Sequence, residues 1–406
     1  MSFQQGLSGL NAAARNLDVI GNNVANANTV GAKASRAEFA DVYATSLYGA
    51  GSNAFGGIGI SVADVTQQFT QGDITTTNSA LDMAINGRGF FRMSSDGEIT
   101  YTRNGQFQLD KDGYIVNAQG GRLTGYRADA NGLVNASVPG DLQLQTGDIA
   151  PRASSTGAVT ANLDAAAKVP TAAFAVNDAT SYNGATTVAV YDAQGAEHTV
   201  AVYFRKSADN TWDVYGAADG TQIGAGPLGS LTFGADGRLA PASPTTLAVS
   251  VPIPAGAGGT LPVTFNLAKM TQFGSPFSVS ELSQNGSAAG RLSGFSVGSD
   301  GTVLARYTNG QTLAQGRVVL ANFTNPQGLA AIGGNQWAET ADSGSPMAGS
   351  PGAGSLGVIQ SGALEQSNVD LTAELVNMIT AQRLYQANAQ AIRTQDQIMQ
   401  TIVNLR

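Results

Sequence analysis

Apolar residues recur at alternating intervals of four and three positions at both ends of the chain. This heptad spacing places apolar side chains along one face of a helix and is typical of helices that pair lengthwise. It predicts one helix over residues 1–25 and a longer one over residues 367–406. The apolar positions predicted to form an assembly interface are Phe3, Leu7, Leu10, Leu17 and Val24 in the first helix, and Leu371, Leu375, Met378, Tyr385, Ile392, Met399 and Val403 in the second.

The C-terminal pattern is apolar on more than one face of the predicted helix. Val376, Ile379 and Leu384 lie off the heptad seam, and many of the polar positions are uncharged glutamines. Gln382 and Asp396 interrupt the seam itself, so two amphipathic helices packed on a globular core are the simpler alternative. A helix that is apolar all round is expected to be enclosed by neighbours. We therefore favour terminal helices that pair as a coiled-coil-like core and are buried in an assembly.

The long interior of the chain has the pattern of strands rather than helices. Asn-Gly and Asp-Gly pairs recur along it, among them Asn104-Gly105, Asp219-Gly220 and Asn309-Gly310, and they separate short runs of alternating apolar and polar residues. Such pairs accommodate the positive φ angles that tight hairpin turns require. The pattern therefore predicts antiparallel strands joined by hairpins.

Two shifts in composition divide this interior. Residues 146–171 are rich in Ala, Ser and Thr, and residues 271–286 are rich in Gly, Ser and Gln. We therefore predict a multidomain α + β fold, with terminal helices followed by antiparallel all-β domains, the distal one inserted into the proximal one. The predicted parts are a terminal helical core domain of residues 1–25 with 367–406, a connecting segment of 26–70 with 359–366, a proximal β-domain of 71–145 with 287–358, and an inserted distal β-domain of 146–286.

The composition argues against several classes of function. Charged residues make up only 12% of the chain and its formal net charge is −8, so no basic surface for nucleic acid is expected. The absence of cysteine excludes disulfides, thiol catalysis and cysteine-bound zinc. No cleavable secretory signal opens the sequence, and no apolar stretch reaches the roughly 18 residues of a membrane-spanning helix, so no membrane insertion is expected.

Residues suited to catalysis are few. His198 is the single histidine, stands at the start of a strand pattern, and is expected to be an exposed strand residue rather than a catalytic one. Trp212 and Tyr215 are the obvious candidates for binding or hydrolysing carbohydrate, although packing in a strand core explains them as well. We predict no enzyme activity, no catalytic, cofactor-binding or metal site, and no cofactor. A surface carbohydrate-binding or hydrolytic β-protein is the alternative from a different class.

Motifs at both ends of the chain resemble those of bacterial flagellar rod and hook proteins. The N-terminal motif is LDVIGNNVAN at residues 17–26, followed by Gly31-Ala32-Lys33, where the family pattern usually has an aromatic residue at the position of Ala32. The other matching blocks are residues 81–91, 101–107, 110–116, 321–329, 364–371 and 378–388. These blocks identify the chain as a member of the flagellar axial superfamily and leave out most of residues 146–286.

The resemblance implies a structural subunit. The inserted β segment and the total length look like the hook members of the family, which polymerise with themselves into a flexible helical tube, a universal joint that transmits motor torque to the filament. The implied partners are the flagellar rod at the proximal end, hook-associated junction proteins and the hook cap at the distal end, and the flagellar type III export apparatus. The implied location is the extracellular hook of the basal body, reached without a cleaved signal peptide. A distal rod or hook-associated axial protein is the alternative within the family.

Overall fold

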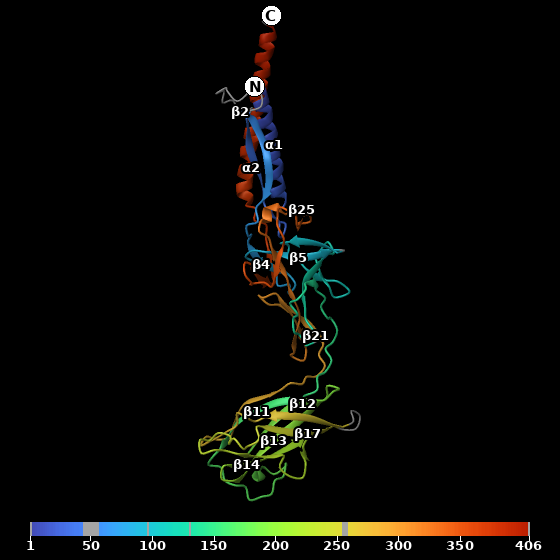
Figure 1. Ribbon diagram of the computed structural model, residues 1–406, viewed down its shortest axis with the longest axis vertical. Coiled ribbons are helices and arrows are strands. Elements are labelled where there is room, and N and C mark those ends of the chain that lie inside the picture. The colour runs from blue at the N-terminus through green and yellow to red at the C-terminus, as the bar shows by residue number, and fades with distance from the viewer. Residues whose placement is uncertain (1, 44–56, 96, 130, 254–258, 405–406) are drawn as a thin grey trace. The chain divides into compact units, whose positions relative to one another are not determined.

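The computed structural model describes residues 2–43, 57–95, 97–129, 131–253 and 259–404. The chain forms two compact units (Figure 1). Unit 1 consists of Met1–Thr146, Gly294–Ala305 and Leu313–Arg406, and unit 2 consists of Gly147–Ser293 and Arg306–Thr312. Two long helices together with many antiparallel strand pairs make this a multidomain α + β protein, which confirms the fold class at that level.

Unit 1 contains both helices, α1 (Ser2–Ala25) and α2 (Leu371–Asn404). The second helix begins at Leu371 rather than at residue 367, so the predicted start is wrong. The reason is the cap: the Asp370 carboxylate accepts hydrogen bonds from the backbone N–H groups of Thr372 and Ala373. Among the described residues, neither helix combines the length and apolar character needed to cross a membrane.

The two helices lie side by side and run antiparallel (Figure 1). Gly6, near the start of α1, faces Asn388 and Ile392 in the second half of α2. Asn23, near the end of α1, instead donates a hydrogen bond of 3.3 Å to Glu374 in the first turn of α2. A β-carbon at Gly6 would stand 3.0 Å from Ile392 Cγ1, so this glycine permits the close approach of the helices.

A long hairpin packs against α1. Its strands β1 (Ser35–Tyr43) and β2 (Gly57–Gln67) pair antiparallel, within the range 26–70 that is predicted only as part of a connecting segment. These strands are not apparent from the sequence because the hairpin is irregular. Its register shifts between Glu38 and Phe39, so the alternation of side chains that reveals a strand is broken.

The β-part of unit 1 is built mainly on one large sheet. Its strands are β5 (Phe90–Ser95), β6 (Glu98–Thr102), β7 (Gln108–Leu109), β8 (Ile115–Val116), β9 (Arg122–Arg127), β10 (Gly140–Asp141), β21 (Leu292–Val297), β22 (Thr302–Tyr307), β23 (Thr312–Val318), β24 (Leu320–Asn322), β25 (Ala330–Gly333), β26 (Gln336–Ala338) and β27 (Met347–Gly349). Its main path runs β21-β22-β23-β9-β5-β6-β26-β25. The 3-10 helix η2 (Pro326–Gly328) stands between β24 and β25. Short aliphatic and aromatic strands from several parts of the sequence thus share one core.

Two small antiparallel pairs bring the segment before α2 back to the N-terminal third of the chain. β3 (Ile74–Thr76) pairs with β29 (Ala363–Glu365), and β4 (Met83–Asn86) pairs with β28 (Val358–Ser361). The side chains of β29 are buried along its whole length. These pairs therefore fix the residues that lead directly into α2.

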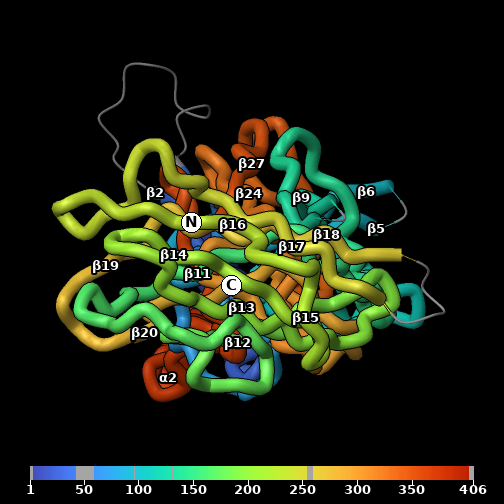
Figure 2. Tube along the Cα trace, turned by 90° about the horizontal axis from the view of Figure 1, so that it is seen from below, coloured from blue at the N-terminus to red at the C-terminus, as the bar shows by residue number. Residues whose placement is uncertain are grey.

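Unit 2 contains two five-stranded sheets within its described residues. One sheet is formed by β12 (Gly184–Tyr191), β13 (Glu197–Ala208), β14 (Thr211–Ala218), β15 (Thr221–Ile223) and β16 (Gly229–Thr232), and the other by β11 (Thr156–Asp164), β17 (Thr246–Ile253), β18 (Gly259–Asn266), β19 (Thr271–Phe273) and β20 (Ser278–Gln284). The 3-10 helix η1 (Ala179–Ser181) precedes β12. Strands β12, β13 and β14 lie next to one another (Figure 2). Buried residues of both sheets belong to one apolar core.

Unit 2 is not purely antiparallel, which corrects the prediction of all-antiparallel domains. β11 pairs parallel with β18 and with β19, and antiparallel with β20. Hairpin signals such as Asp-Gly reveal pairs between strands that follow one another in the sequence. They carry no information about β11, whose partners lie far along the chain.

Candidate functional site

The residues predicted to form an interface lie on the helices of unit 1, and those that the structure describes are not fully buried. Phe3, Leu7, Leu371, Leu375, Tyr385 and Met399 are exposed, with between 37% and 56% of each residue accessible. Leu10, Leu17, Val24, Met378 and Ile392 are partly buried. The side chain of Val403 lies outside the described residues.

The helical residues that are buried in the single chain are mostly smaller ones. Ala12 and Ala13 of α1 and Ala381 of α2 are each less than 9% exposed. Gly9 lies against the Asn388 side chain, whose nearest atom would be 3.0 Å from a β-carbon. These residues are not among the predicted contacts because the heptad pattern is defined by large apolar side chains. The closely spaced glycines and alanines of α1 are the sequence feature that could have indicated this close helix contact.

Further large apolar residues of α2 are exposed, although they are off the predicted seam. Val376, Ile379, Leu384 and Ile398 are between 48% and 58% exposed. We define the exposed helix surface as Phe3, Leu7, Leu371, Leu375, Val376, Ile379, Leu384, Tyr385, Ile398 and Met399. So many exposed large apolar side chains on two paired helices indicate a surface that is covered by a partner.

A buried group of three charges lies where the helices meet the β-part of unit 1. Lys33 Nζ is 2.6 Å from Glu365 Oε1, and Arg103 Nη1 is 3.0 Å from Glu365 Oε2. The three side chains, which we call the junction triad, are at most 4% exposed. Each comes from a different motif of the sequence, so the triad joins the N-terminal, central and C-terminal motifs at one point.

Backbone groups add hydrogen bonds to the junction triad, whereas Arg103 Nε is buried and makes none in the described structure. The Gly72 N–H donates to Glu365 Oε1, and Lys33 Nζ donates to the Thr70 carbonyl. Burial lowers the pKa of Lys33 and the pKa of Arg103, whereas the charge and hydrogen bonds of Glu365 act in the opposite direction. Glu365 is therefore the group that makes it possible to bury two cations together.

Two asparagines hold the backbone that follows α1. Asn23 exchanges two hydrogen bonds with Ser35, accepting from its N–H and donating to its carbonyl. Asn368 accepts a hydrogen bond from the Ala34 N–H and donates one to the Gln68 carbonyl. The residues immediately before α2 and those of the β1–β2 hairpin are thus fixed to the same short stretch of chain.

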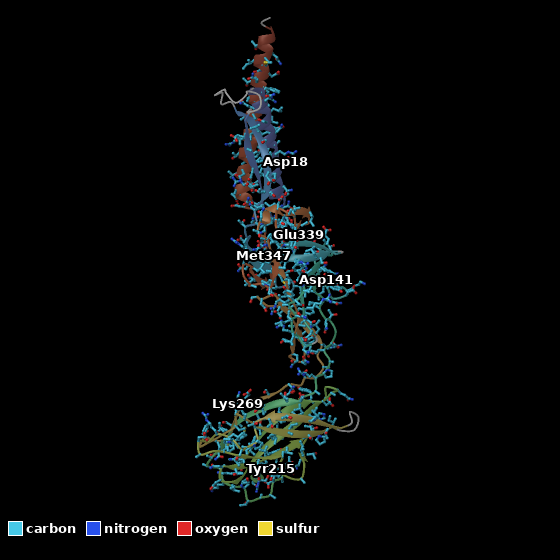
Figure 3. All side chains as sticks on the ribbon, viewed as in Figure 1. Asp18, Asp141, Tyr215, Lys269, Glu339 and Met347 are labelled. Carbon is cyan, nitrogen blue, oxygen red and sulfur yellow. The ribbon has the colours of Figure 1, made fainter. Side chains whose placement is uncertain are left out.

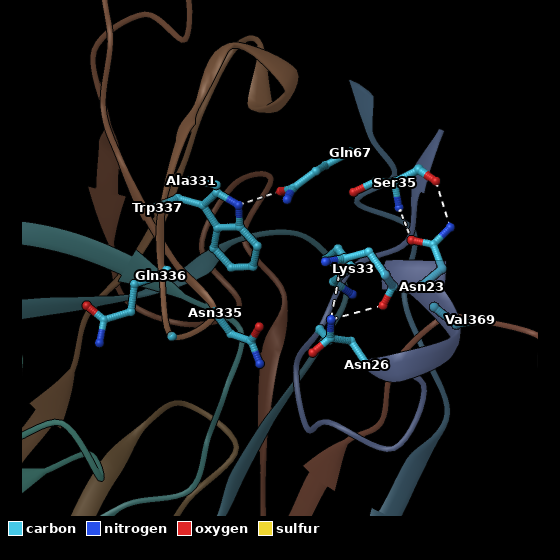
Figure 4. Close-up of a pocket in the computed structure, with 14 residues that line it drawn as sticks. Asn23, Asn26, Lys33, Ser35, Gln67, Ala331, Asn335, Gln336, Trp337 and Val369 are labelled. Atoms are coloured by element: carbon cyan, nitrogen blue, oxygen red, sulfur yellow. Dashed lines mark hydrogen bonds between the residues drawn. The ribbon is translucent and has the colours of Figure 1, made fainter. Parts of the chain in front are cut away.

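Ala32, where the sequence departs from the family pattern, is only 4% exposed and lines a cavity of about 340 Å³ (Figure 4). The cavity is also lined by Asn23, Asn335 and Trp337, whose Nε1 donates a hydrogen bond to Gln67. The space beside Ala32 is therefore bounded mainly by neutral amide groups and one indole ring.

The residues considered for catalysis or carbohydrate binding are buried or covered. His198 is 6% exposed, so the prediction of an exposed histidine is wrong; the turns that carry two aspartates close over its ring. Trp212 is 1% exposed and its Nε1 donates a hydrogen bond to Gln272. Tyr215 lies in unit 2 (Figure 3). Its ring stacks on that of Phe174, with the ring centroids 4.0 Å apart. Within the described residues no cluster of three or more His, Asp or Glu side chains is suited to hold a metal ion.

Four family models match the chain in sequence order. They are described as "Flagella basal body rod protein" (residues 3–33), "Flagellar hook protein FlgE/F/G D1 domain" (84–161), "Flagellar basal body protein FlaE D2 domain" (162–287) and "Flagellar basal body rod FlgEFG protein C-terminal" (360–405). The first and last of these contain the two helices, and the middle two contain most of the strands.

Several flagellar hook proteins match the chain over its full length. The flagellar hook protein FlgE of Escherichia coli is 43% identical over 416 residues, covering 100% of both chains. The flagellar hook protein FlgE of Rhizobium meliloti is 34% identical, covering 100% of this chain and 98% of its own. The crystal structure of the Helicobacter pylori flagellar hook protein FlgE2 is similar in fold, with a TM-score of 0.55 at 15% identity, covering 72% of this chain and 100% of that one.

Proposed function

The chain belongs to the flagellar hook protein family, and we propose that the exposed helix surface is where its copies bind one another. The protein is a structural subunit of the bacterial flagellar hook and not an enzyme. The alternative of a rod protein loses its support, because relatives matched over the full length are hook proteins.

The observation that carries the proposal is the exposure of large aliphatic side chains along α2. Leu375, Val376, Ile379 and Leu384 are each about half exposed in the single chain. Burying one such side chain completely stabilises an assembly by about 1.5–3 kcal/mol, and partial burial gives a proportionate share. The contribution recurs at every subunit, so helices that are poorly covered in one chain become a well-covered core in a polymer.

In this proposal the assembly is a helical tube. Copies that join through two different surfaces, without closing a ring, generate a helix. The terminal helices form a coiled-coil-like core domain of residues 1–25 with 367–406, and residues 26–70 with 359–366 connect it to a proximal β-domain of 71–145 with 287–358. The distal β-domain, 146–286, is an insertion in the proximal one. The division of the chain into two units, the second beginning at Gly147, supports this arrangement.

The same proposal assigns different roles to the core and the β-domains. Apolar contacts between helices resist twisting and so transmit motor torque, while low-charge β surfaces slide between near-equal arrangements and let the tube bend. The partners are the flagellar rod at the proximal end, hook-associated junction proteins and a cap at the distal end, and the type III export apparatus. The location is the extracellular hook.

Electron microscopy of polymers of the full chain tests this function. We expect curved tubes, because contacts between neutral β surfaces include few ion pairs that would fix a single register. Short fragments of the same tubes should adopt more than one curvature when temperature or pH is changed. A rigid, straight polymer under all conditions would contradict the bending role and favour that of a rod.

A further inference from the structure

His198 lies between two aspartates that belong to different turns of unit 2. Its Nδ1 is 2.8 Å from Asp219 Oδ2, in the turn between β14 and β15. Its Nε2 is 3.7 Å from Asp192 Oδ2, in the turn between β12 and β13. The side chains of His198 and Asp192 are 7% and 3% exposed, so water has little access to the pair.

Backbone hydrogen bonds hold both carboxylates in place. Asp192 Oδ1 accepts from the N–H groups of Gln194 and Ala196, and Asp219 Oδ1 accepts from the N–H group of Thr199. The second oxygen of each carboxylate is left to face the imidazole ring. His198 Nε2 is buried and makes no hydrogen bond in the described structure.

We propose that His198 is a pH-dependent fastener that, when protonated, ties the β12–β13 turn to the β14–β15 turn. In the imidazolium form both ring nitrogens carry a proton and each faces a carboxylate. When the ring is neutral, Nδ1 keeps its proton for Asp219, and the lone pair of Nε2 then faces the Asp192 carboxylate. Loss of the proton therefore releases the β12–β13 turn and leaves the other contact in place.

The two aspartates beside the ring favour the protonated form of His198. The hydrogen bond that His198 donates to Asp219 raises the pKa of His198, and burial lowers it. The charge of Asp219 and the contact with Asp192 raise this pKa further. Burial raises the pKa of Asp192, but the backbone N–H donors and His198 lower it by more, so the net shift is downward. The hydrogen bond with His198 is the largest cause of the lowered pKa of Asp219. Glu197 is the neighbouring acid on β13 and is exposed on the opposite face of the strand.

The sign of the pH dependence follows from these directions. A histidine whose pKa is raised on folding contributes its full stabilisation below its ordinary pKa of 6.5, and the contribution is lost as the pH rises through the higher folded value. The aspartates, whose pKa values are lowered, contribute fully above 3.8, and this contribution is lost as the pH falls through their folded values. Both contacts of the fastener are therefore fully stabilising between pH 3.8 and pH 6.5. The contact with Asp192 is lost as the pH rises above this range.

Nuclear magnetic resonance of the full chain measures the fastener directly, because His198 is the single histidine and gives one imidazole titration. We expect a titration midpoint above 6.5 that falls in Asp219→Asn and, by a smaller amount, in Asp192→Asn. Glu197→Gln is the matched control, since it removes an adjacent negative charge without touching either contact, and it should leave the midpoint nearly unchanged. A midpoint at or below 6.5 in the unmodified chain overturns the proposal.

Amide exchange in residues 192–196 supplies the second readout. After correction for the intrinsic pH dependence of exchange, the opening equilibrium of this turn should increase across the titration by about tenfold for each pKa unit above 6.5. Asp192→Asn retains an oxygen that accepts the hydrogen bonds of the turn, and it should abolish that increase. This variant leaves His198 in place, so the test does not depend on whether a variant such as His198→Gln folds. An increase of the same size in Asp192→Asn would show that the turn opens for another reason and would refute the fastener.

Discussion

Replacing Leu375 by aspartate is expected to abolish polymer formation while leaving both units folded. Leu375 is 49% exposed in the single chain, so the substitution costs the isolated subunit little. In the polymer it removes apolar burial and places an unpaired carboxylate among apolar neighbours. The combined cost of about 4 kcal/mol or more per subunit corresponds to an increase of about a thousandfold in the concentration needed for polymerisation.

Sedimentation of polymer over a series of protein concentrations measures this effect. Leu375→Met is the matched control, because it keeps an apolar side chain of similar volume and should polymerise nearly as well as the unmodified chain. Fluorine resonance of 5-fluorotryptophan reports folding of each unit, since Trp337 lies in unit 1 and Trp212 in unit 2. If Leu375→Asp polymerises at the same concentration as the unmodified chain, Leu375 does not lie in the interface between subunits.

Replacing Glu365 by glutamine is expected to destabilise unit 1 by about 3–5 kcal/mol, because it leaves buried cations without their counter-charge. Lys33 and Arg103 both lose their ionic partner, and the Lys33 side chain has no exposure to water. Glutamine has nearly the same shape, so the loss reports the charge rather than the packing. Unit 2 should be unaffected, since the junction triad lies wholly in unit 1.

Denaturant unfolding followed at the fluorine resonance of Trp337 tests the role of Glu365. Asp141→Asn is the control: it breaks the ion pair of Asp141 with Arg122 in the same unit, whose side chains are 25% and 43% exposed, and should cost at most about 1 kcal/mol. Equal shifts of the Trp337 transition in the two variants would show that the junction triad is no more important than a surface ion pair.

The sequence predicts the helices well, because their apolar periodicity persists over many turns. It predicts the end of α1 at residue 25, as observed, and places the start of α2 four residues before Leu371. It does not predict how the helices approach each other. Their closest contacts involve glycine and alanine, and these small residues do not stand out in a pattern of large apolar side chains. Some residues of the predicted apolar seam are exposed in the single chain and the other described ones are only partly buried.

Features that depend on contacts between distant segments could not be read from local patterns. Lys33, Arg103 and Glu365 each lie in a recognisable motif, yet nothing in the spacing of these motifs indicates that the three side chains meet. The parallel strands of unit 2 are hidden for the same reason. His198 seemed exposed because one polar residue at the start of a strand gives no sign of the two aspartates that enclose it.

Hydroxyl-radical footprinting of the free chain and of its polymer tests the central claim most directly, since it measures the accessibility of individual side chains. Leu375, Leu384 and Met399 should react readily in the free chain and lose most of their reactivity in the polymer. Trp212, which is buried in unit 2, should stay unreactive in both and provides the reference. If the side chains of α2 react equally in the free chain and in the polymer, the exposed helix surface is not where the subunits meet.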